Sequence, residues 1–285
     1  MTRKLPRCIG VIHLPSLPGS PGSSGMHPAA ALSRAGLWAV KEARALQLAG
    51  FDGLILENFG DTPFYKTEVP PETIAAFSVI AAAVRESVRI PIGINVLRND
   101  ARAALSIAAV TGADFIRVNV LSGVTATDQG LIEGDSAALI RERLRLNATH
   151  VAILADVHVK HARSLSSESL ALAIEETAGR GGADAVIVTG TTTGRAPIRG
   201  DLELAFHAAK QAGVPLFVGS GLDPRALSDL PDPSIGLIVG SALRRGGRAG
   251  APLEPKRLRD FIRSAKVAKR KPRGKRNAKA RRTPT

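Results

Sequence analysis

Residues 216–241 read LFVGSGLDPRALSDLPDPSIGLIVGS, and the two ends of this stretch decide the fold. Each end is a short apolar run, Leu216–Val218 and Leu237–Val239, followed directly by glycine and serine. A short apolar run bounded by turn residues is typical of a strand that is buried on both faces, as in a parallel sheet. The chain is therefore expected to contain buried parallel strands.

Similar runs recur along the chain and alternate with Ala- and Leu-rich segments of helical periodicity. This alternation is typical of βα units on a parallel sheet. The predicted strands are Cys8–Leu14, Gly53–Asn58, Ile92–Leu97, Phe115–Val120, Val151–His158, Ala185–Thr189, Leu216–Ser220 and Leu237–Ser241. The predicted helices are Ser33–Ala49, Pro71–Ser87, Asp100–Thr111, Asp135–Asn147, Ser167–Arg180, Asp201–Ala212, Pro224–Asp229 and Glu254–Ala268.

Eight strands and eight helices fit a single α/β domain, a (β/α)₈ or TIM barrel, over residues 1–265. An open, doubly wound sheet is the alternative, because parallel strands need not close into a barrel.

Ser33 and Asp100 are predicted to cap the amino termini of their helices. Two long connections, Pro15–Leu32 and Ser122–Gly134, follow strand ends and are expected to form lids over a site.

The positive charge of the chain is concentrated at its end. Of the net charge of +14, +10 comes from Lys266–Thr285, which contains no acidic residue, and +4 comes from the rest. This segment has no apolar periodicity after Val267, so we predict a disordered basic tail over 266–285. The tail either makes a weak, salt-sensitive contact with nucleic acid or an anionic membrane, or only increases solubility.

The composition is that of an ordinary globular domain with an aliphatic core. Hydrophobic residues make up 44% of the chain and aromatic residues only 4%. The single cysteine, Cys8, lies in an apolar run and is expected to be a buried, reduced thiol. Neither a secretory signal nor a run of about 18 apolar residues is present, so a cytoplasmic location is expected. A homo-oligomer is left open.

Almost every predicted strand ends in a polar side chain. Because the carboxyl ends of barrel strands surround one mouth, these side chains are expected to form a single binding site. A rim of polar groups that only bond one another is the alternative. The residues are His13, Glu57, Asn58, Asn95, Asn119, Asp156, His158, Thr189, Ser220 and Ser241.

The glycine-serine pairs after the last two strands predict a phosphate site. Glycine allows backbone N–H groups to approach an anion, and barrels often bind phosphate between these two loops. An isolated Gly-Ser pair is usually only a turn, so the placement carries this prediction. The residues expected to bind substrate or its phosphate are His13, Asn95, Asn119, Thr189, Thr191, Gly219, Ser220, Gly221, Gly240 and Ser241.

Four residues are predicted to be catalytic. The strand period of two places Asp156, His158 and Lys160 on one face, where they could exchange a proton, clamp an anion or form a structural salt-bridged column. Glu57 is a candidate general base, ahead of Asp61. Glu57, Asp156 and His158 could also bind a divalent metal ion. Walker A, dinucleotide-binding GxGxxG, HExxH and nucleophile-elbow motifs are absent, which argues against those chemistries.

Five segments occur in order along the predicted barrel: Gly10–Pro21, Leu56–Asp61, Ile94–Leu97, Leu154–His161 and Val239–Ser241. Together they resemble the BtpA family, and the match runs from about residue 8 to 264, without the basic tail. The resemblance implies a barrel of the ribulose-phosphate-binding type.

The resemblance implies two functions. Relatives in non-photosynthetic microbes imply an enzyme that binds a phosphorylated sugar or nucleoside at the barrel mouth, with its reaction unknown. Cyanobacterial members imply the alternative, a non-enzymatic photosystem I biogenesis or stability factor at the membrane periphery. Where the family pattern suggests a lysine after Ser241, this chain has Arg244 and Arg245, which could keep affinity for an anion.

Overall fold

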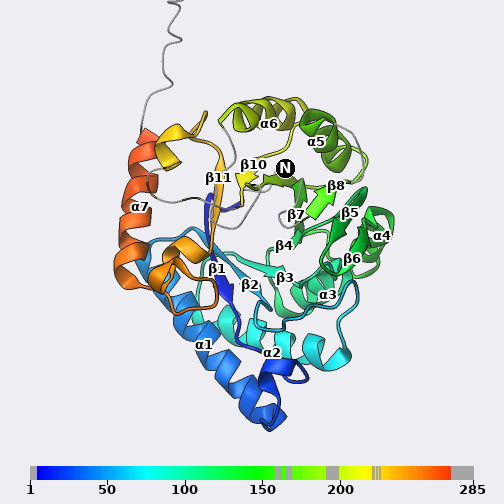
Figure 1. Cartoon of the computed structure of the whole chain (residues 1–285), viewed down its shortest axis with the longest axis vertical. Coiled ribbons are helices and arrows are strands. Elements are labelled where there is room, and N and C mark those ends of the chain that lie inside the picture. The colour runs from blue at the N-terminus through cyan, green and yellow to red at the C-terminus, as the bar shows by residue number, and fades with distance from the viewer. Residues whose placement is uncertain are drawn as a thin grey trace, which may run out of the picture.

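The centre of the molecule is a closed barrel of parallel strands (Figure 1). This computed structural model describes residues 5–157, 162–164, 169–190, 199–219, 222, 224 and 226–270. The first barrel strand pairs with both the second and the last, so the sheet closes and the open-sheet alternative is wrong. In their order around the barrel the strands are β1 (Cys8–His13), β11 (Gly236–Val239), β10 (Leu216–Val218), β9 (Ala185–Val188), β7 (Ala152–Val157), β4 (Phe115–Val118), β3 (Ile92–Asn95) and β2 (Gly53–Glu57).

The helices lie outside the barrel and cover it (Figure 1). Between β10 and β11 the described residues contain a single 3-10 turn, Ala226–Asp229, where an α-helix over Pro224–Asp229 was predicted. The barrel prediction itself is confirmed. The α-helices are α1 (Pro28–Ala49), α2 (Pro71–Ser87), α3 (Ala101–Thr111), α4 (Ser136–Arg145), α5 (Leu170–Ala178), α6 (Arg199–Gln211) and α7 (Pro255–Arg270).

The start of one helix agrees with the sequence-based prediction and the start of another does not. Asp100 caps α3 by accepting a hydrogen bond from the backbone N–H of Ala103 at 2.8 Å. Ser33 is not a cap, because α1 already begins at Pro28, with His27 in the capping position. Proline is favourable at the first position of a helix, since the N–H that it lacks would have no partner there.

The interior of the barrel, away from the carboxyl ends of its strands, is a packed apolar core. Phe115 and Phe217 fill it, and each faces a glycine on a neighbouring strand. A Cβ added to Gly93 would lie 2.2 Å from the ring of Phe115, and one added to Gly236 would lie 2.1 Å from the ring of Phe217. Bulky rings opposite glycines fill the barrel without voids. Polar side chains are therefore confined to the carboxyl end of the strands.

The connection after β4 contains secondary structure that was not predicted. Instead of an irregular lid over Ser122–Gly134, it forms a hairpin of β5 (Val124–Thr127) and β6 (Gly130–Glu133). β8 (Ala162–Ser164) pairs antiparallel with β5, which gives a small sheet of order β6-β5-β8 beside the barrel (Figure 1).

Helix α7 extends into the segment that was predicted to be disordered. It runs through Arg270, so Lys266–Arg270 are helical rather than part of a disordered tail. Ala265 is buried and Ala268 packs against the same core, which explains why the helix continues. The remaining tail, 271–285, lies outside the described residues. In the described part of the chain, no helix combines the length and apolar character needed to cross a membrane.

Candidate functional site

Three predicted site residues form a row at the mouth of the barrel. Strand register pairs His13 of β1 with Glu57 of β2, and Glu57 with Asn95 of β3. All three side chains point to the interior, because they continue the alternation that places Val11 and Ile55 in the inner core. All three are buried. The mouth therefore holds an imidazole, a carboxylate and an amide side by side.

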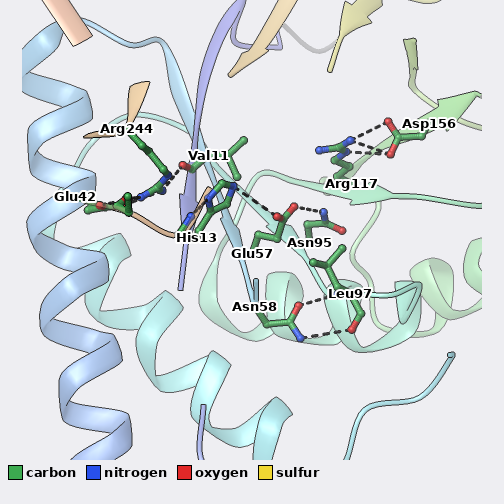
Figure 2. Close-up of polar contacts among 12 residues, drawn as sticks. Val11, His13, Glu42, Glu57, Asn58, Asn95, Leu97, Arg117, Asp156 and Arg244 are labelled. Carbon is green, nitrogen blue, oxygen red and sulfur yellow. Dashed lines mark hydrogen bonds and ion pairs between the residues drawn. The ribbon is translucent and has the colours of Figure 1, made fainter. Parts of the chain in front are cut away.

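The hydrogen bonds of this row suit Glu57 to acid-base chemistry. Asn95 Nδ2 donates to Glu57 Oε2 at 2.7 Å, and His13 Nε2 lies 3.8 Å from Glu57 Oε1 (Figure 2). The backbone N–H of Gly250 donates to His13 Nδ1 at 3.0 Å. Because Nδ1 is an acceptor, a neutral His13 carries its proton on Nε2, the nitrogen nearer Glu57. Phe59 stacks on the imidazole with ring centroids 4.5 Å apart and restricts its orientation.

A second network lies on the β4 and β7 side of the mouth. Arg117 donates from Nε and Nη2 to the two carboxylate oxygens of Asp156, each at 3.1 Å (Figure 2). Asn119 Nδ2 donates to Asp156 Oδ2 at 2.8 Å. Burial lowers the pKa of Arg117, but Asp156 and Glu57 raise it by more, so the guanidinium stays charged. Asp156 is thus bound to a cation within the mouth.

Arg98 brings a second guanidinium towards the same networks. It follows β3, and its backbone N–H donates to the carbonyl of Tyr65 at 3.1 Å. Burial lowers the pKa of Arg98, while Asp156 among other acids opposes this change and Arg117 adds to it. Arg98 therefore lies within electrostatic range of Arg117 and Asp156.

Neither arginine was predicted from the sequence. Arg117 stands two residues after Phe115 and two before Asn119, so the strand period places all three on the interior face. That period was a usable signal for Arg117. Arg98 lies in an irregular segment after β3, where no periodicity indicates the direction of a side chain.

Two amide oxygens in the mouth have no hydrogen-bond partner among the described residues: Oδ1 of Asn95 and Oδ1 of Asn119. Asn95 is 1% exposed and Asn119 is 4% exposed. A buried acceptor without a partner costs about 1–3 kcal/mol, so both oxygens are positioned to accept hydrogen bonds from a ligand.

Two of the glycines predicted to bind phosphate lie beside these side chains. A Cβ added to Gly219 would lie 3.5 Å from Arg117 Nη2, and one added to Gly240 would lie 3.1 Å from His13 Nε2. The space around Gly219 is already filled by Ile187 Cγ2 at 2.6 Å and Thr189 Cγ2 at 3.0 Å from the same Cβ position. The two glycines therefore allow these strand ends to pack closely against the polar side chains of the mouth.

The other residues predicted for the phosphate site are placed only in part. Thr189 is buried directly after β9, and Ser241 begins the 3-10 turn Ser241–Leu243. The phosphate site therefore stays a prediction at those positions. His158, Lys160, Thr191, Ser220 and Gly221 lie outside the described residues.

Asn58 and Asp61 hold loops together and face one another rather than the mouth. Asn58 Oδ1 accepts from the backbone N–H of Leu97 at 2.7 Å (Figure 2). Its Nδ2 donates to Asp61 Oδ2 at 3.2 Å. Asp61 Oδ1 accepts from the backbone N–H of Leu17 at 2.8 Å. Burial raises the pKa of Asp61, against the lowering effect of these hydrogen bonds. These two residues join the loops that follow β1, β2 and β3.

Arg244 does not face the mouth, so the expectation that it could bind an anion there is wrong. It is fully buried between β1 and α1, where it donates to both carboxylate oxygens of Glu42 at 3.0 and 3.1 Å (Figure 2). It also donates to the backbone carbonyls of Val11 and Ala251. The 3-10 turn after β11 directs the chain outward and causes this placement.

The predicted metal ligands are divided between networks. Glu57 bonds to Asn95, whereas Asp156 bonds to Arg117 and Asn119, and His158 lies outside the described residues. Within the described ranges, no three His, Cys, Asp or Glu side chains are grouped so that they could hold a metal ion. A metal site at these residues stays a prediction.

Comparison with known proteins assigns relatives over nearly the whole chain. The profile of the BtpA family matches residues 4–267. The photosystem I biogenesis protein BtpA of Synechocystis is 48% identical over 254 residues, which cover 89% of this chain and 86% of that protein. An uncharacterized protein of Pyrococcus horikoshii is 49% identical over 240 residues, covering 84% and 88%.

Solved structures share the fold at low sequence identity. N-(5'-phosphoribosyl)anthranilate isomerase of Pyrococcus furiosus superposes with a TM-score of 0.54 and 15% identity, covering 92% of this chain and 99% of that one. A structure named native KDPGal superposes with a TM-score of 0.54 and 18% identity, covering 94% and 98%. At this identity the likeness establishes the barrel fold alone.

Proposed function

The chain belongs to the BtpA family, and we propose that it is an enzyme that binds a phosphorylated sugar or nucleoside at the mouth of its barrel. One observation carries this proposal: the mouth combines an oriented carboxylate with a buried cation. Glu57 is held by Asn95 and faces His13, while Arg117 is charged and lies beside Gly219. Proton transfer and anion binding are thus supported within one opening.

Glu57 and His13 would move the proton. Asn95 fixes Glu57 Oε2, which leaves Oε1 as the oxygen that faces His13 Nε2 and the mouth. His13 is in turn held by the backbone N–H of Gly250. A base oriented in this way is suited to take a proton from a hydroxyl or from carbon next to a carbonyl.

Arg117 would stabilise negative charge on the substrate. Asp156 and Asn119 hold it in place, so its guanidinium needs no rearrangement when charge develops during the reaction. The role proposed for Asp156 is therefore to position Arg117 rather than to touch the substrate. His158, Lys160, Ser220 and Gly221 remain proposed members of the same site.

The name of the Synechocystis relative supports a second candidate, a role in photosystem I biogenesis. The Pyrococcus relative is just as similar and is uncharacterized, so the degree of identity favours neither function. The two can be separated in a cyanobacterium that lacks its own relative. A non-enzymatic factor would restore photosystem I with Glu57→Gln as well as with the wild type.

A thermal-shift panel tests the proposed enzyme. Pairs of phosphorylated and unphosphorylated sugars and nucleosides would be screened with and without Mg²⁺, Mn²⁺ and Zn²⁺. A ligand present at 100 times its Kd increases the free energy of unfolding by about 2.7 kcal/mol, which raises the unfolding midpoint by several degrees. We expect such a shift only with phosphorylated members. A panel in which no phosphorylated compound raises the midpoint would reject the proposal.

Turnover of the compound so identified then tests Glu57. We expect Glu57→Gln to bind the compound but to lose at least about 100-fold in kcat, because a general base contributes about 10²–10⁴. Glu175→Gln, at an exposed position of α5, is the matched control and should turn over normally. Full activity of Glu57→Gln would show that another group is the base.

A further inference from the structure

We propose that the substrate lies across the mouth in one direction, with hydroxyl groups over β3 and β4 and its phosphate towards β10 and β11. This inference rests on the proposed function and adds to it the chemical class of the part of the substrate remote from the phosphate. It depends on the two unpaired amide oxygens, Asn95 Oδ1 and Asn119 Oδ1.

The orientation of both amides is determined by their carboxylate partners. Asn95 Nδ2 donates to Glu57 and Asn119 Nδ2 donates to Asp156. An ionised carboxylate only accepts hydrogen bonds, so neither amide can rotate its oxygen towards that partner without placing two acceptors against each other. Oδ1 of each asparagine is therefore a fixed acceptor.

Two fixed, buried acceptors select a ligand that donates. The hydroxyl of a sugar can donate to each amide oxygen and also accept from a neighbouring group. A phosphate dianion offers only acceptors, so next to these oxygens it would leave both unpaired and would be repelled. The β3 and β4 side of the mouth is therefore built for the polyol part of the substrate, and not for its phosphate.

The opposite side of the mouth has complementary properties. Gly219 follows β10 and Gly240 follows β11, and as glycines neither projects a side chain into the mouth. The backbone N–H of Gly219 donates to the carbonyl of Val188, so the donor proposed for the phosphate at this position is a side chain. Gly219 also lies beside Nη2 of Arg117, a charged donor. Arg117 belongs to β4, but its Nη2 lies next to Gly219 at the end of β10. The amide acceptors at the ends of β3 and β4 and this charged donor beside β10 thus specify the direction of the bound substrate.

The inference predicts discrimination at hydroxyl groups. Calorimetric titration would compare ribose phosphate with deoxyribose phosphate, and glucose phosphate with deoxyglucose phosphate, using inorganic phosphate as the probe for the anion alone. Loss of one hydrogen bond to a buried amide should weaken binding about 10-fold. We expect this loss for at least one deoxygenated sugar phosphate, relative to its hydroxylated parent.

Variants separate the two ends of the site. Asn95→Leu and Asn119→Leu should each remove the preference for the hydroxylated sugar. Asn95→Leu should also keep the affinity for inorganic phosphate, because Asn95 bonds to Glu57 and not to the Arg117–Asp156 pair. Gly240→Ala should do the reverse, because its Cβ would enter the phosphate side next to His13. The comparison of sugars on the wild-type protein needs no variant, so it remains decisive even if an asparagine variant fails to fold.

The outcomes distinguish this inference from the function on which it rests. If deoxygenated sugar phosphates bind as tightly as their parents, or if both asparagine variants keep the preference, the direction is wrong while the phosphate site stands. If neither inorganic phosphate nor any sugar phosphate binds, the proposed function fails as well.

Discussion

The molecule contains two buried arginine-carboxylate pairs that are alike in chemistry and different in surroundings. Arg244 and Glu42 lie between β1 and α1, and Arg244 also donates to two backbone carbonyls. Arg117 and Asp156 lie in the barrel mouth, and among the described residues Arg117 donates to Asp156 alone. The outer guanidinium is fully buried, whereas the inner one is 9% exposed.

The difference shows which pair serves the fold and which serves a ligand. The outer pair joins α1 to β1 and to the chain that follows β11. The inner pair lies beside Gly219 and is joined to Asn119, whose amide oxygen lacks a partner. An unpaired atom alone does not separate the two pairs, because Arg244 Nε is also buried without a partner among the described residues. The pairs differ in place: Arg117 and Asp156 lie in the barrel mouth, where a ligand can reach them, and Arg244 and Glu42 lie outside the barrel.

Arg244→Met should give the largest effect on stability. It leaves the Glu42 carboxylate buried without its cation, which costs about 3–5 kcal/mol. Urea unfolding would measure this loss. Since the pair lies away from the mouth, the protein that remains folded should bind phosphorylated ligands normally. A loss below about 1 kcal/mol would contradict the structural role.

The loss in Arg244→Met should also depend on pH. Burial already raises the pKa of Glu42, and Arg244 is the main group that opposes this rise. Without Arg244 the folded-state pKa increases further above its ordinary value of 4.5. A group whose pKa is raised by folding loses stability as pH rises, so the deficit should be smaller at pH 5 than at pH 8. A deficit that does not change with pH would show that Glu42 stays ionised.

Arg117→Met should destabilise the protein less, by about 2–3 kcal/mol, because Asp156 keeps its hydrogen bond from Asn119. Here the main effect should be on ligand binding. The thermal shift produced by a phosphorylated ligand should disappear, which it should not do in Arg244→Met. Equal ligand responses in the two variants would remove the distinction between the pairs.

Gly219→Ala tests the space beside the inner pair. The added Cβ would lie 2.6 Å from Ile187 Cγ2 and 3.5 Å from Arg117 Nη2, so we expect a loss of about 1–2 kcal/mol from overpacking. Phosphate affinity should fall as well. Gly36→Ala in α1 is the control, since the nearest atom, in Ile80, is 4.0 Å away. Unchanged phosphate affinity in Gly219→Ala would place the anion elsewhere.

Asp61→Asn should give the smallest effect, about 1 kcal/mol. Asparagine keeps the oxygen that accepts from Leu17 but replaces the oxygen that accepts from Asn58 Nδ2. Burial raises the pKa of Asp61 above its ordinary value of 3.8, so the wild type loses stability as pH rises above that value. Asparagine cannot ionise, and the variant should therefore gain relative to the wild type with rising pH. Unfolding in urea at pH 4 and pH 7 measures this trend, and the opposite trend would mean that Asp61 is stabilised as a carboxylate.

The barrel and one row of its mouth could be predicted from the sequence. Buried parallel strands appear as apolar runs, and the polar residue that ends each run marks the mouth, as it does for His13, Glu57 and Asn95. Arg117 was not predicted, although the strand period of two places it on the same inner face as Asn119. The hairpin of β5 and β6 was missed because its turn, Asp128-Gln129, lacks the Asn-Gly or Asp-Gly signal.

Other features depend on tertiary structure. Arg244 follows Ser241 closely in sequence, which suggested that both serve the phosphate site, but a single 3-10 turn directs Arg244 to the outside of the barrel. Its partner Glu42 lies on a helix far away in sequence, so no local pattern could join them. The amide oxygens of Asn95 and Asn119 lack partners because of how side chains from several strands meet in the mouth, which no local sequence pattern indicates.

The most direct test replaces each pair as a whole. Arg117→Met with Asp156→Leu, and Arg244→Met with Glu42→Leu, both remove a buried ion pair without leaving a charge unpaired, a change that is often neutral for stability. The measurement is the thermal shift caused by the sugar phosphate that stabilises the wild type most. The inner double variant should lose this shift and the outer one should keep it. A shift retained by the inner double variant would contradict a ligand site at the mouth.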